Sequence, residues 1–439
     1  MARLGSFLAI FGLGVVVAVR AEPSLQDVID QNQRLQEQVR AQQKVIDELS
    51  AQMAEMRKAS ERQDRELQGL QDRAESPAAE RSAPEDHGES LVRLSGEAGL
   101  AFFRTGPAGQ FPNSEFRVDD AKLFVEAQVW KNVYAVSEID LMTREASDEN
   151  VYLGAFYADF ENVSALWGVE RAVNVRVGRF PIPFGEEYQV RGVMDNPLIS
   201  HSLSDVWGFD QGVEAYGQAG GLQYVVAVQN GGASRLHDFN SDKSVTARVG
   251  ADPAAWLHLS ASAMRTGDLS MKSDTLSAVW FGNAFFRALG PAATTQTFHA
   301  ELYEADGTGR WKTGHVTAAA GRADFDDDDT TADNARKMNY WFVEGLQEIG
   351  DGFYGVARYS AIHVPKGYPL AGFGNAGNYF YNPFATLTQN LSRMSVGFGY
   401  RIGPPLVLKF EYSRERGQLV NGVQRDREDF LSTEVGLKF

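Results

Sequence analysis

The segment from Ala172 to Phe180 is the feature that most narrows what this chain can fold into. Val173, Val175 and Val177 fall on one face of the predicted strand and Arg176 falls on the other, because successive side chains of a strand point to opposite faces. An apolar face backed by a cation does not suit a soluble sheet. It suits a strand with lipid outside and a water-filled lumen inside, since the lumen solvates what the bilayer cannot. The segment therefore predicts one strand of a transmembrane β-barrel.

A long connection follows, from Pro181 to Gly208, and prolines and glycines interrupt it. It is too long for a hairpin, and it carries charged residues such as Arg191 and Asp205. Connections longer than about 12–15 residues usually have a function of their own. We expect this connection to fold into the lumen and narrow it.

Short alternating segments recur from Leu91 to the last residue, with Gly, Pro, Asp or Asn between them. We predict strands at Leu91–Arg104, Phe116–Trp130, Asn132–Thr143, Val151–Phe160, Ala172–Phe180, Phe209–Gly217, Leu222–Asn230, Lys243–Ala251, Trp256–Arg265, Thr275–Phe286, Gln296–Glu304, Trp311–Ala323, Met338–Ile349, Gly352–His363, Leu391–Ile402, Pro405–Arg416 and Glu428–Phe439. This set is odd in number, and a barrel with both ends of the chain on one side needs an even number. We therefore expect about sixteen strands, with eighteen as the alternative. We expect the surplus segment to lie between Gln296 and Ala323, where the alternation is weakest.

Short and long connections alternate along these strands. The short turns, which we expect to face the periplasm, are Trp130–Val133, Ala219–Gly221, Ala251–Ala255, Gly350–Asp351 and Gly403–Pro404. The long connections Pro181–Gly208, Gly231–Asp242 and Val364–Asn390 are expected to face outside.

The last strand has the clearest alternation. Leu431, Val435 and Phe439 lie on one face, whereas Ser432 and Glu434 lie on the other. An ordinary edge strand is the alternative, but an aromatic residue at the very end resembles the terminal signal that the bacterial barrel-assembly machinery reads. We expect that machinery to be a partner of the chain.

Composition excludes several classes of function. The chain of 439 residues has no cysteine, so it forms no disulfide and holds no thiolate metal site. Its formal net charge of −16 weighs against a nucleic-acid partner. The histidines show no Ser/His pairing and no GxSxG motif, so we expect no enzyme. The acidic run Asp324–Asp329 could offer oxygen ligands to calcium, but its spacing fits a solvated loop better, and we expect no cofactor.

The N-terminus predicts two further segments. Residues 1–21 have the basic start, apolar core and small-residue end of a signal peptide, with a membrane anchor as the alternative. Residues 22–73 contain a heptad repeat from Ser24 to Leu70, typical of a coiled coil about 70 Å long. A single charged surface helix is the other interpretation. A Pro- and Ala-rich linker at 74–90 separates this α-helical coiled coil from an all-β barrel at 91–439.

The polar strand faces also predict the lining of the lumen. If the apolar faces meet lipid, basic side chains line or approach the pore at Lys122, Arg176, Arg179, Arg191, Arg248, Arg358, Arg401 and Lys409. Guanidinium groups offer paired donors to phosphate or carboxylate. Acidic side chains such as Glu126 and Glu411 share these faces, so for each arginine a structural salt bridge is as good an interpretation as an anion site.

Three stretches together resemble the phosphate-selective porin O/P family of outer-membrane channels: Asn174–Gly185 (NVRVGRFPIPFG), Phe209–Val213 (FDQGV) and Tyr224–Gly231. Phe116–Thr143 and the last strand fit the same family, so the resemblance covers 91–439. It implies a homotrimer in the outer membrane and passive diffusion of small solutes. It also implies a preference for anions such as phosphate, through an arginine ladder and a ring of lysines that this sequence matches incompletely. The alternatives are a cation-preferring or non-selective porin, and an envelope tether in which the coiled coil holds the barrel to the cell wall.

Overall fold

A computed structural model describes residues 92–142, 151–206, 208–231, 238, 241–271, 285–286, 289, 294–379 and 387–439. The chain divides into two compact units, Met1–Asp86 and His87–Phe439. The predicted signal peptide, coiled coil and linker lie outside the described residues. Among the residues that are described, no helix is long and apolar enough to cross a membrane.

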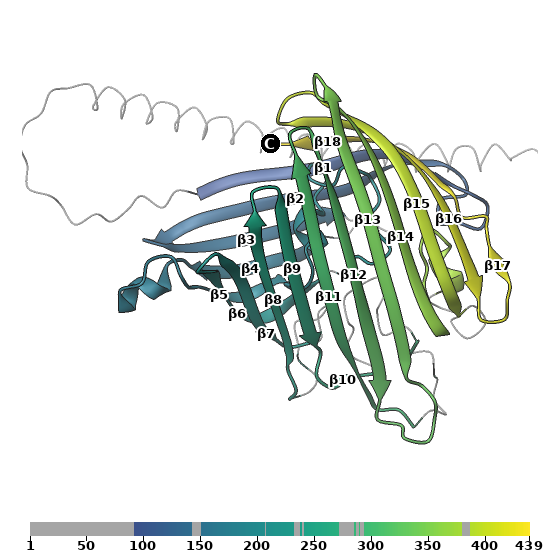
Figure 1. The fold of residues 1–439 in the computed structure, drawn as a ribbon, viewed down its shortest axis with the longest axis horizontal. Helices are drawn as coiled ribbons and strands as arrows, with labels where there is room; N and C mark the ends of the chain where they lie inside the picture. The colour runs from purple at the N-terminus through teal and green to yellow at the C-terminus, as the bar shows by residue number, and fades with distance from the viewer. Residues whose placement is uncertain are drawn as a thin grey trace, which may run out of the picture. The chain divides into compact units, whose positions relative to one another are not determined.

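The second unit is built almost entirely from antiparallel strands (Figure 1). The strands are β1 (Val92–Thr105), β2 (Glu115–Trp130), β3 (Val133–Met142), β4 (Tyr152–Phe160), β5 (Asn174–Pro181), β6 (Phe209–Ala219), β7 (Leu222–Gln229), β8 (Ser244–Ala254), β9 (Leu257–Arg265), β10 (Leu269–Ser270), β11 (Thr297–Trp311), β12 (Gly314–Asp327), β13 (Arg336–Gly350), β14 (Phe353–Tyr368), β15 (Thr388–Arg401), β16 (Leu406–Leu419), β17 (Gln424–Arg425) and β18 (Phe430–Lys438). Short helical turns with described bounds lie between the strands at η1 (Val163–Trp167), η2 (Glu187–Val190) and α3 (Ala376–Tyr379).

The sheet closes on itself. β1 pairs with β2 on one side and with β18 on the other, and β16 pairs directly with β18. The two-residue strands β10 and β17 only extend the edges of β11 and β16. Without them, the ring contains sixteen of the eighteen strands in the sheet, so the prediction of sixteen is confirmed.

The surplus predicted strand is not where we expected it. Both segments between Gln296 and Ala323 are real strands, β11 and β12. Most of the predicted strand Thr275–Phe286 lies outside the described residues, but its last two residues, Phe285 and Phe286, adopt a helical turn. Since β9 pairs directly with β11, no strand stands between them in the ring.

The strands turn apolar side chains outward and polar side chains inward. In β18, Val435 is 36% exposed, whereas Ser432 and Glu434 are at most 3% exposed, as the alternation of the last strand predicts. Large apolar side chains are exposed around the outer face, for example Phe116 at 86% and Phe156 at 58%. An apolar outside and a polar inside are typical of a barrel that faces lipid.

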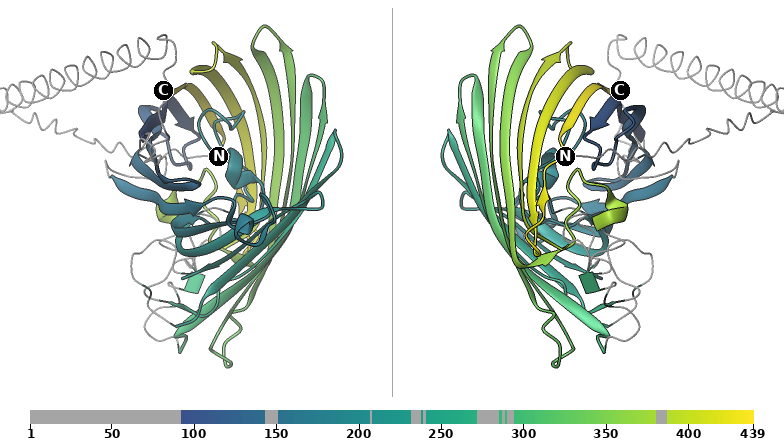
Figure 2. Two further views of the ribbon diagram at one scale, coloured as in Figure 1. Left: turned by 90° about the vertical axis from the view of Figure 1, so that its left-hand side faces the viewer. Right: turned by 90° about the vertical axis from the view of Figure 1, so that its right-hand side faces the viewer.

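The two rims of the barrel differ. The connections β2–β3, β6–β7, β8–β9, β11–β12, β13–β14 and β15–β16 lie at one rim, which we call the short-turn rim, together with Val92 and the last residue. The longer connections lie at the opposite rim. The one extended connection at the short-turn rim joins β4 to β5 and contains η1. The wall is also uneven (Figure 2): β5 has 8 residues and β14 has 16.

Candidate functional site

The connection between β5 and β6 lies inside the barrel. We call its residues 182–206 the plug. Apolar plug side chains such as Phe184, Leu198 and Leu203 are no more than 1% exposed although they belong to a loop. Backbone groups of the plug contact inward side chains of the wall, so the plug occupies part of the lumen, as the length of the connection predicts.

Glu411 of β16 holds the middle of the plug. Its carboxylate accepts hydrogen bonds from the backbone N–H groups of Ile199 (2.8 Å) and Ser200 (2.7 Å), and from the Ser200 hydroxyl (2.5 Å). Ser413, two residues along the same strand face, donates another at 2.5 Å. Glu411 is completely buried. Four donors stabilise its negative charge there, and no residue in the described part of the chain forms a salt bridge with it.

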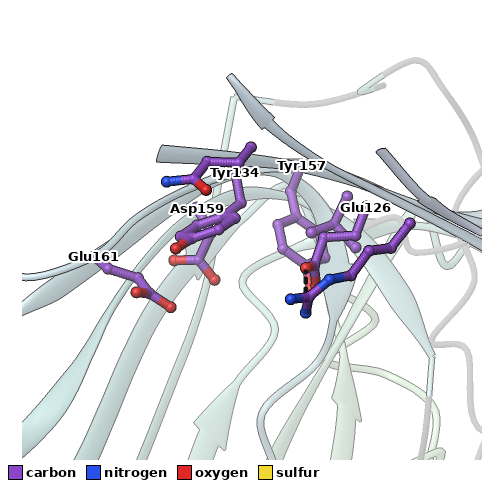
Figure 3. Close-up of a pocket in the computed structure, with 8 residues that line it drawn as sticks. Glu126, Tyr134, Tyr157, Asp159 and Glu161 are labelled. Carbon is purple, nitrogen blue, oxygen red and sulfur yellow. Dashed lines mark ion pairs between the residues drawn. The ribbon is translucent and has the colours of Figure 1, made fainter. Parts of the chain in front are cut away.

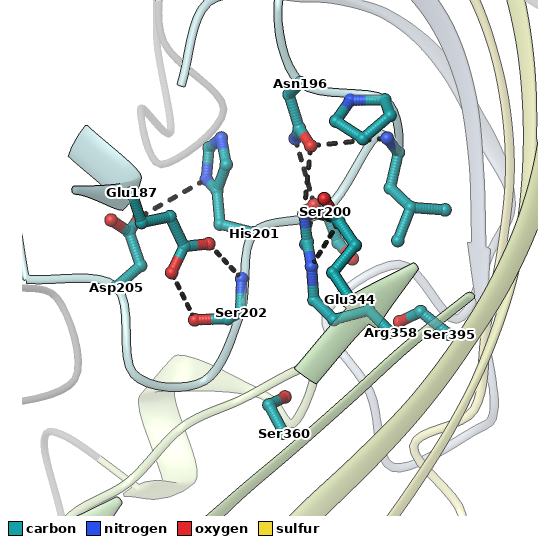
Figure 4. A network of polar contacts seen from close by, with 12 residues as sticks. Glu187, Asn196, Ser200, His201, Ser202, Asp205, Glu344, Arg358, Ser360 and Ser395 are labelled. Atoms are coloured by element: carbon teal, nitrogen blue, oxygen red, sulfur yellow. Dashed lines mark hydrogen bonds and ion pairs between the residues drawn. The ribbon is translucent and has the colours of Figure 1, made fainter. Parts of the chain in front are cut away.

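Arg358 of β14 holds the same part of the plug from another strand (Figure 4). Its guanidinium pairs with Glu344 of β13, with 2.5 Å between Nη2 and Oε2. It also donates to the carbonyl oxygen of Ser200 (2.7 Å) and to Oδ1 of Asn196 (3.1 Å). The Asn196 side chain in turn donates to the Ser200 carbonyl oxygen at 3.0 Å. This part of the plug is thus bound to two strands: its backbone N–H groups donate to Glu411 of β16, and the Ser200 carbonyl oxygen accepts from Arg358 of β14.

Other wall cations repeat the arrangement of Arg358. Lys409 pairs with Glu434 (2.8 Å) and donates to the carbonyl oxygen of Leu198 (3.3 Å). Arg248 donates to the carbonyl oxygen of Gly185 (2.9 Å) and pairs with Glu186 (3.2 Å), which belongs to the plug. In each case a carboxylate neutralises the cation while the plug backbone takes one of its hydrogen bonds, so these cations act as clamps on the plug.

Arg393 of β15 is a clamp that sequence reasoning missed. It pairs with Glu415 (2.7 Å), donates to the carbonyl oxygen of His201 (3.0 Å) and is 2% exposed. A signal was present, because Arg393 lies eight residues before Arg401 and so on the same strand face. Glu411 was expected to point inward, and it does, but its role as the main anchor has no signature in the sequence.

Packing reinforces these polar contacts. Leu198 at the tip of the plug is buried with Leu346, Tyr354, Val356 and Val407 of the wall. Burying one such leucine contributes about 1.5–3 kcal/mol.

Gly185 lets the start of the plug approach β11 closely. Its φ is +71°, and a Cβ atom there would lie 2.3 Å from Oε1 of Glu304. A side chain would therefore be strained by its backbone conformation and would also clash with the wall.

The remaining predicted cations do not meet in one ladder. Lys122 of β2 pairs with Glu138 at 3.3 Å, and Arg191 pairs with Asp205 within the plug. Arg401 lies near the short-turn rim, 4.0 Å from Glu348.

The two predicted arginines of β5 also have partners. Arg176 pairs with Asp159 (2.9 Å) and Glu214 (3.1 Å). Arg179 donates to the backbone carbonyl oxygens of Leu153 and Gly154. The eight candidates are thus spread over six strands and the plug, and seven of them have a carboxylate within 4.0 Å.

The inner wall between β1 and β4 carries a hollow near the short-turn rim (Figure 3). Its volume is about 320 Å³. The lining side chains are Arg93, Glu126, Gln128, Tyr134, Val136, Tyr157, Asp159 and Glu161. None of these side chains belongs to the plug.

Comparison with known proteins identifies the fold. No family model matches the sequence, and no curated protein sequence matches it. Among solved structures, the outer membrane channel DcaP of Acinetobacter baumannii is 12% identical with a TM-score of 0.54, covering 80% of this chain and 97% of that one. Outer-membrane expressed OmpT of Vibrio cholerae is 10% identical with a TM-score of 0.53, covering 80% and 98%.

OprB of Pseudomonas putida is a third match, 11% identical with a TM-score of 0.50, covering 80% of this chain and 94% of that one. Identities this low show a common fold and nothing finer. The resemblance to phosphate-selective porins is finer than a shared fold and stays a prediction. The barrel has the fold of these three proteins, of which DcaP and OmpT are outer-membrane proteins.

Proposed function

We propose that this protein is an outer-membrane channel for passive diffusion of small solutes, narrowed by its plug. The observation that carries the proposal is the inverted barrel: a closed ring of strands with apolar side chains outside and charged side chains inside. Water and solutes suit such an interior and lipid suits such an exterior. The fold shared with the outer-membrane proteins DcaP and OmpT supports the same location.

Liposome swelling tests this function. The purified full-length protein, inserted into liposomes, should admit small sugars quickly and larger oligosaccharides slowly, because the plug occupies part of the lumen. Equal rates with and without folded protein, for every sugar, would refute the channel function. Heat-denatured protein is the control for leakage caused by detergent.

A preference for anions such as phosphate is the finer form of this proposal, and the resemblance to phosphate-selective porins supports it. We expect this preference to be weak, because a phosphate must compete with the carboxylates that already pair with the predicted cations. The reversal potential across a planar bilayer in a salt gradient, with phosphate competing against chloride, measures it. Clear cation selectivity would remove the anion proposal.

We further propose that the chain is a homotrimer, with a signal peptide at 1–21, a periplasmic coiled coil at 22–73 and a linker at 74–90. The outer face of β2 and of the shorter strand β4 supports assembly, because Phe116, Trp130 and Phe156 there are each more than half exposed. Subunit contacts would cover these side chains, and they would also cover the neighbouring strands β3 and β5, whose 10 and 8 residues barely span a bilayer.

The heptads favour a second role for the N-terminal arm, as a tether to the cell wall. Deletion of Ser24–Leu70 separates the two roles. A channel keeps its conductance after the deletion, whereas a tether loses attachment of the outer membrane to the wall.

A further inference from the structure

The hollow on the inner wall of β1–β4 has a surplus of negative charge. Three of its lining residues, Glu126, Asp159 and Glu161, carry carboxylates, and only Arg93 carries a cation. Arg93 pairs with Glu126 at 3.6 Å. Asp159 forms an ion pair with Arg176, and Arg176 forms a second ion pair with Glu214. The hollow and its neighbours together are therefore negative.

Glu161 is the acid with the least compensation. It follows β4 at the short-turn rim, and its backbone N–H donates to the carbonyl oxygen of Asn132 at 2.8 Å. Its carboxylate has no ion pair or hydrogen bond among the described residues. Glu161 and Glu126 lie at opposite ends of the row of lining side chains, with the two tyrosines and Asp159 between them (Figure 3).

Tyr134 and Tyr157 add aromatic faces to these acids. A cation is attracted to the face of an aromatic ring within about 6 Å of its centroid. This wall already uses that interaction, since the Arg176 guanidinium lies 4.4 Å from the centroid of Tyr157 and 5.0 Å from that of Tyr216. The carboxylate of Glu161, close to these aromatic rings and within a negative hollow, gives the surroundings that a protonated amine prefers, whereas an anion would be repelled.

We infer that this hollow is a binding site for organic cations with more than one amino group. The site rests on the proposed function, because solutes would reach it through the lumen and bind it at the short-turn rim. One ammonium group pairs with Glu161, and another competes with Arg93 for Glu126. The chain between them, which in spermidine carries a third ammonium group, lies against Tyr134 and Tyr157. Binding slows such cations selectively, so the channel has a substrate class beyond small solutes in general.

Calorimetric titration of the full-length protein in detergent with spermidine tests this site without requiring conduction. Spermidine should bind and succinate should not. Glu161→Gln should weaken spermidine binding about tenfold, and Tyr134→Ala about threefold, as expected for one charge-assisted contact and one cation–π contact. The matched control is Glu170→Gln, which removes the same charge from the same β4–β5 connection outside the hollow and should change the affinity less than twofold.

Equal affinity for succinate, or equal effects of Glu161→Gln and Glu170→Gln, would overturn the site. The binding site and the channel function can be refuted independently of each other. Sugar uptake without spermidine binding contradicts the site alone, whereas spermidine binding without any sugar uptake contradicts the channel alone.

Discussion

The anchor at Glu411 makes the most specific prediction about the plug. Glu411→Gln keeps the size of the side chain but removes its charge. The Ser200 and Ser413 hydroxyls can turn to accept from the new amide, whereas the two backbone N–H groups of Ile199 and Ser200 are left with a neutral acceptor. Each of these two backbone hydrogen bonds becomes weaker by about 1 kcal/mol, because a hydrogen bond to a neutral acceptor contributes less than one to a charged acceptor. The total of about 2 kcal/mol corresponds to roughly thirtyfold in the equilibrium between seated and released plug.

Single-channel recording in planar bilayers measures this change. We expect the Glu411→Gln channel to visit a higher-conductance substate about thirty times more often than the unmodified channel, and Glu411→Ala to do so more often still, because it leaves two buried N–H groups without an acceptor. Glu115→Gln is the matched control, since Glu115 lies at the rim with the longer connections and pairs with Arg117, and no hydrogen bond or ion pair joins it to the plug in the described part of the chain. If Glu411→Ala showed no more substate openings than this control, the anchor would not hold the plug.

Three further predictions concern stability. Arg358→Met leaves Glu344 buried without its partner, so the urea midpoint of unfolding should fall by the equivalent of about 3–5 kcal/mol. An unchanged midpoint would contradict the clamp. Leu198→Ala removes the apolar side chain at the tip of the plug, so the free energy that holds the plug against the wall should fall by about 2–5 kcal/mol. The looser plug should make the open-channel current noisier, and an unchanged noise level would show that Leu198 does not hold the plug. Hydrogen bonds from Thr294 and Thr331 lower the pKa of Asp329, in the β12–β13 connection, to about 2. Because the folded pKa lies below the 3.8 of a free side chain, the stabilisation is present above about pH 4 and disappears as the pH falls through about 2. Pepsin should therefore cleave this connection faster at pH 2 than at pH 3, whereas Asp329→Asn should be cleaved equally fast at both.

Alternation along the strands was enough to predict the ring, because every second residue must face the same side. It correctly separated the outward Val435 from the inward Glu434. Arg358 and Lys409, predicted to line the pore, are buried and donate hydrogen bonds to the plug. Alternation failed at Phe285 and Phe286, which look like strand residues but pack inside with Phe298 and Tyr368. Apolar side chains that fill the lumen of a barrel follow no period, so the sequence has no signal for them.

The interior was harder to predict than the wall. The length of the 181–208 connection indicated a plug, but the partners of the inward cations could not be read from sequence. Arg248, Arg358 and Lys409 each bind a plug carbonyl oxygen, and carbonyl groups are the same in every residue. A polar strand face therefore predicts where a charge points and leaves its partner to the tertiary fold.

The central claim is that a water-filled path runs through this closed barrel beside the plug. Planar-bilayer recording of the purified full-length protein tests this claim most directly. A difference in electrophoretic mobility between unboiled and boiled samples shows beforehand that the protein is folded. The account predicts discrete, uniform conductance steps that grow when the plug is released by Glu411→Ala. Folded protein that inserts into the bilayer and gives no steps, in either form, would contradict it.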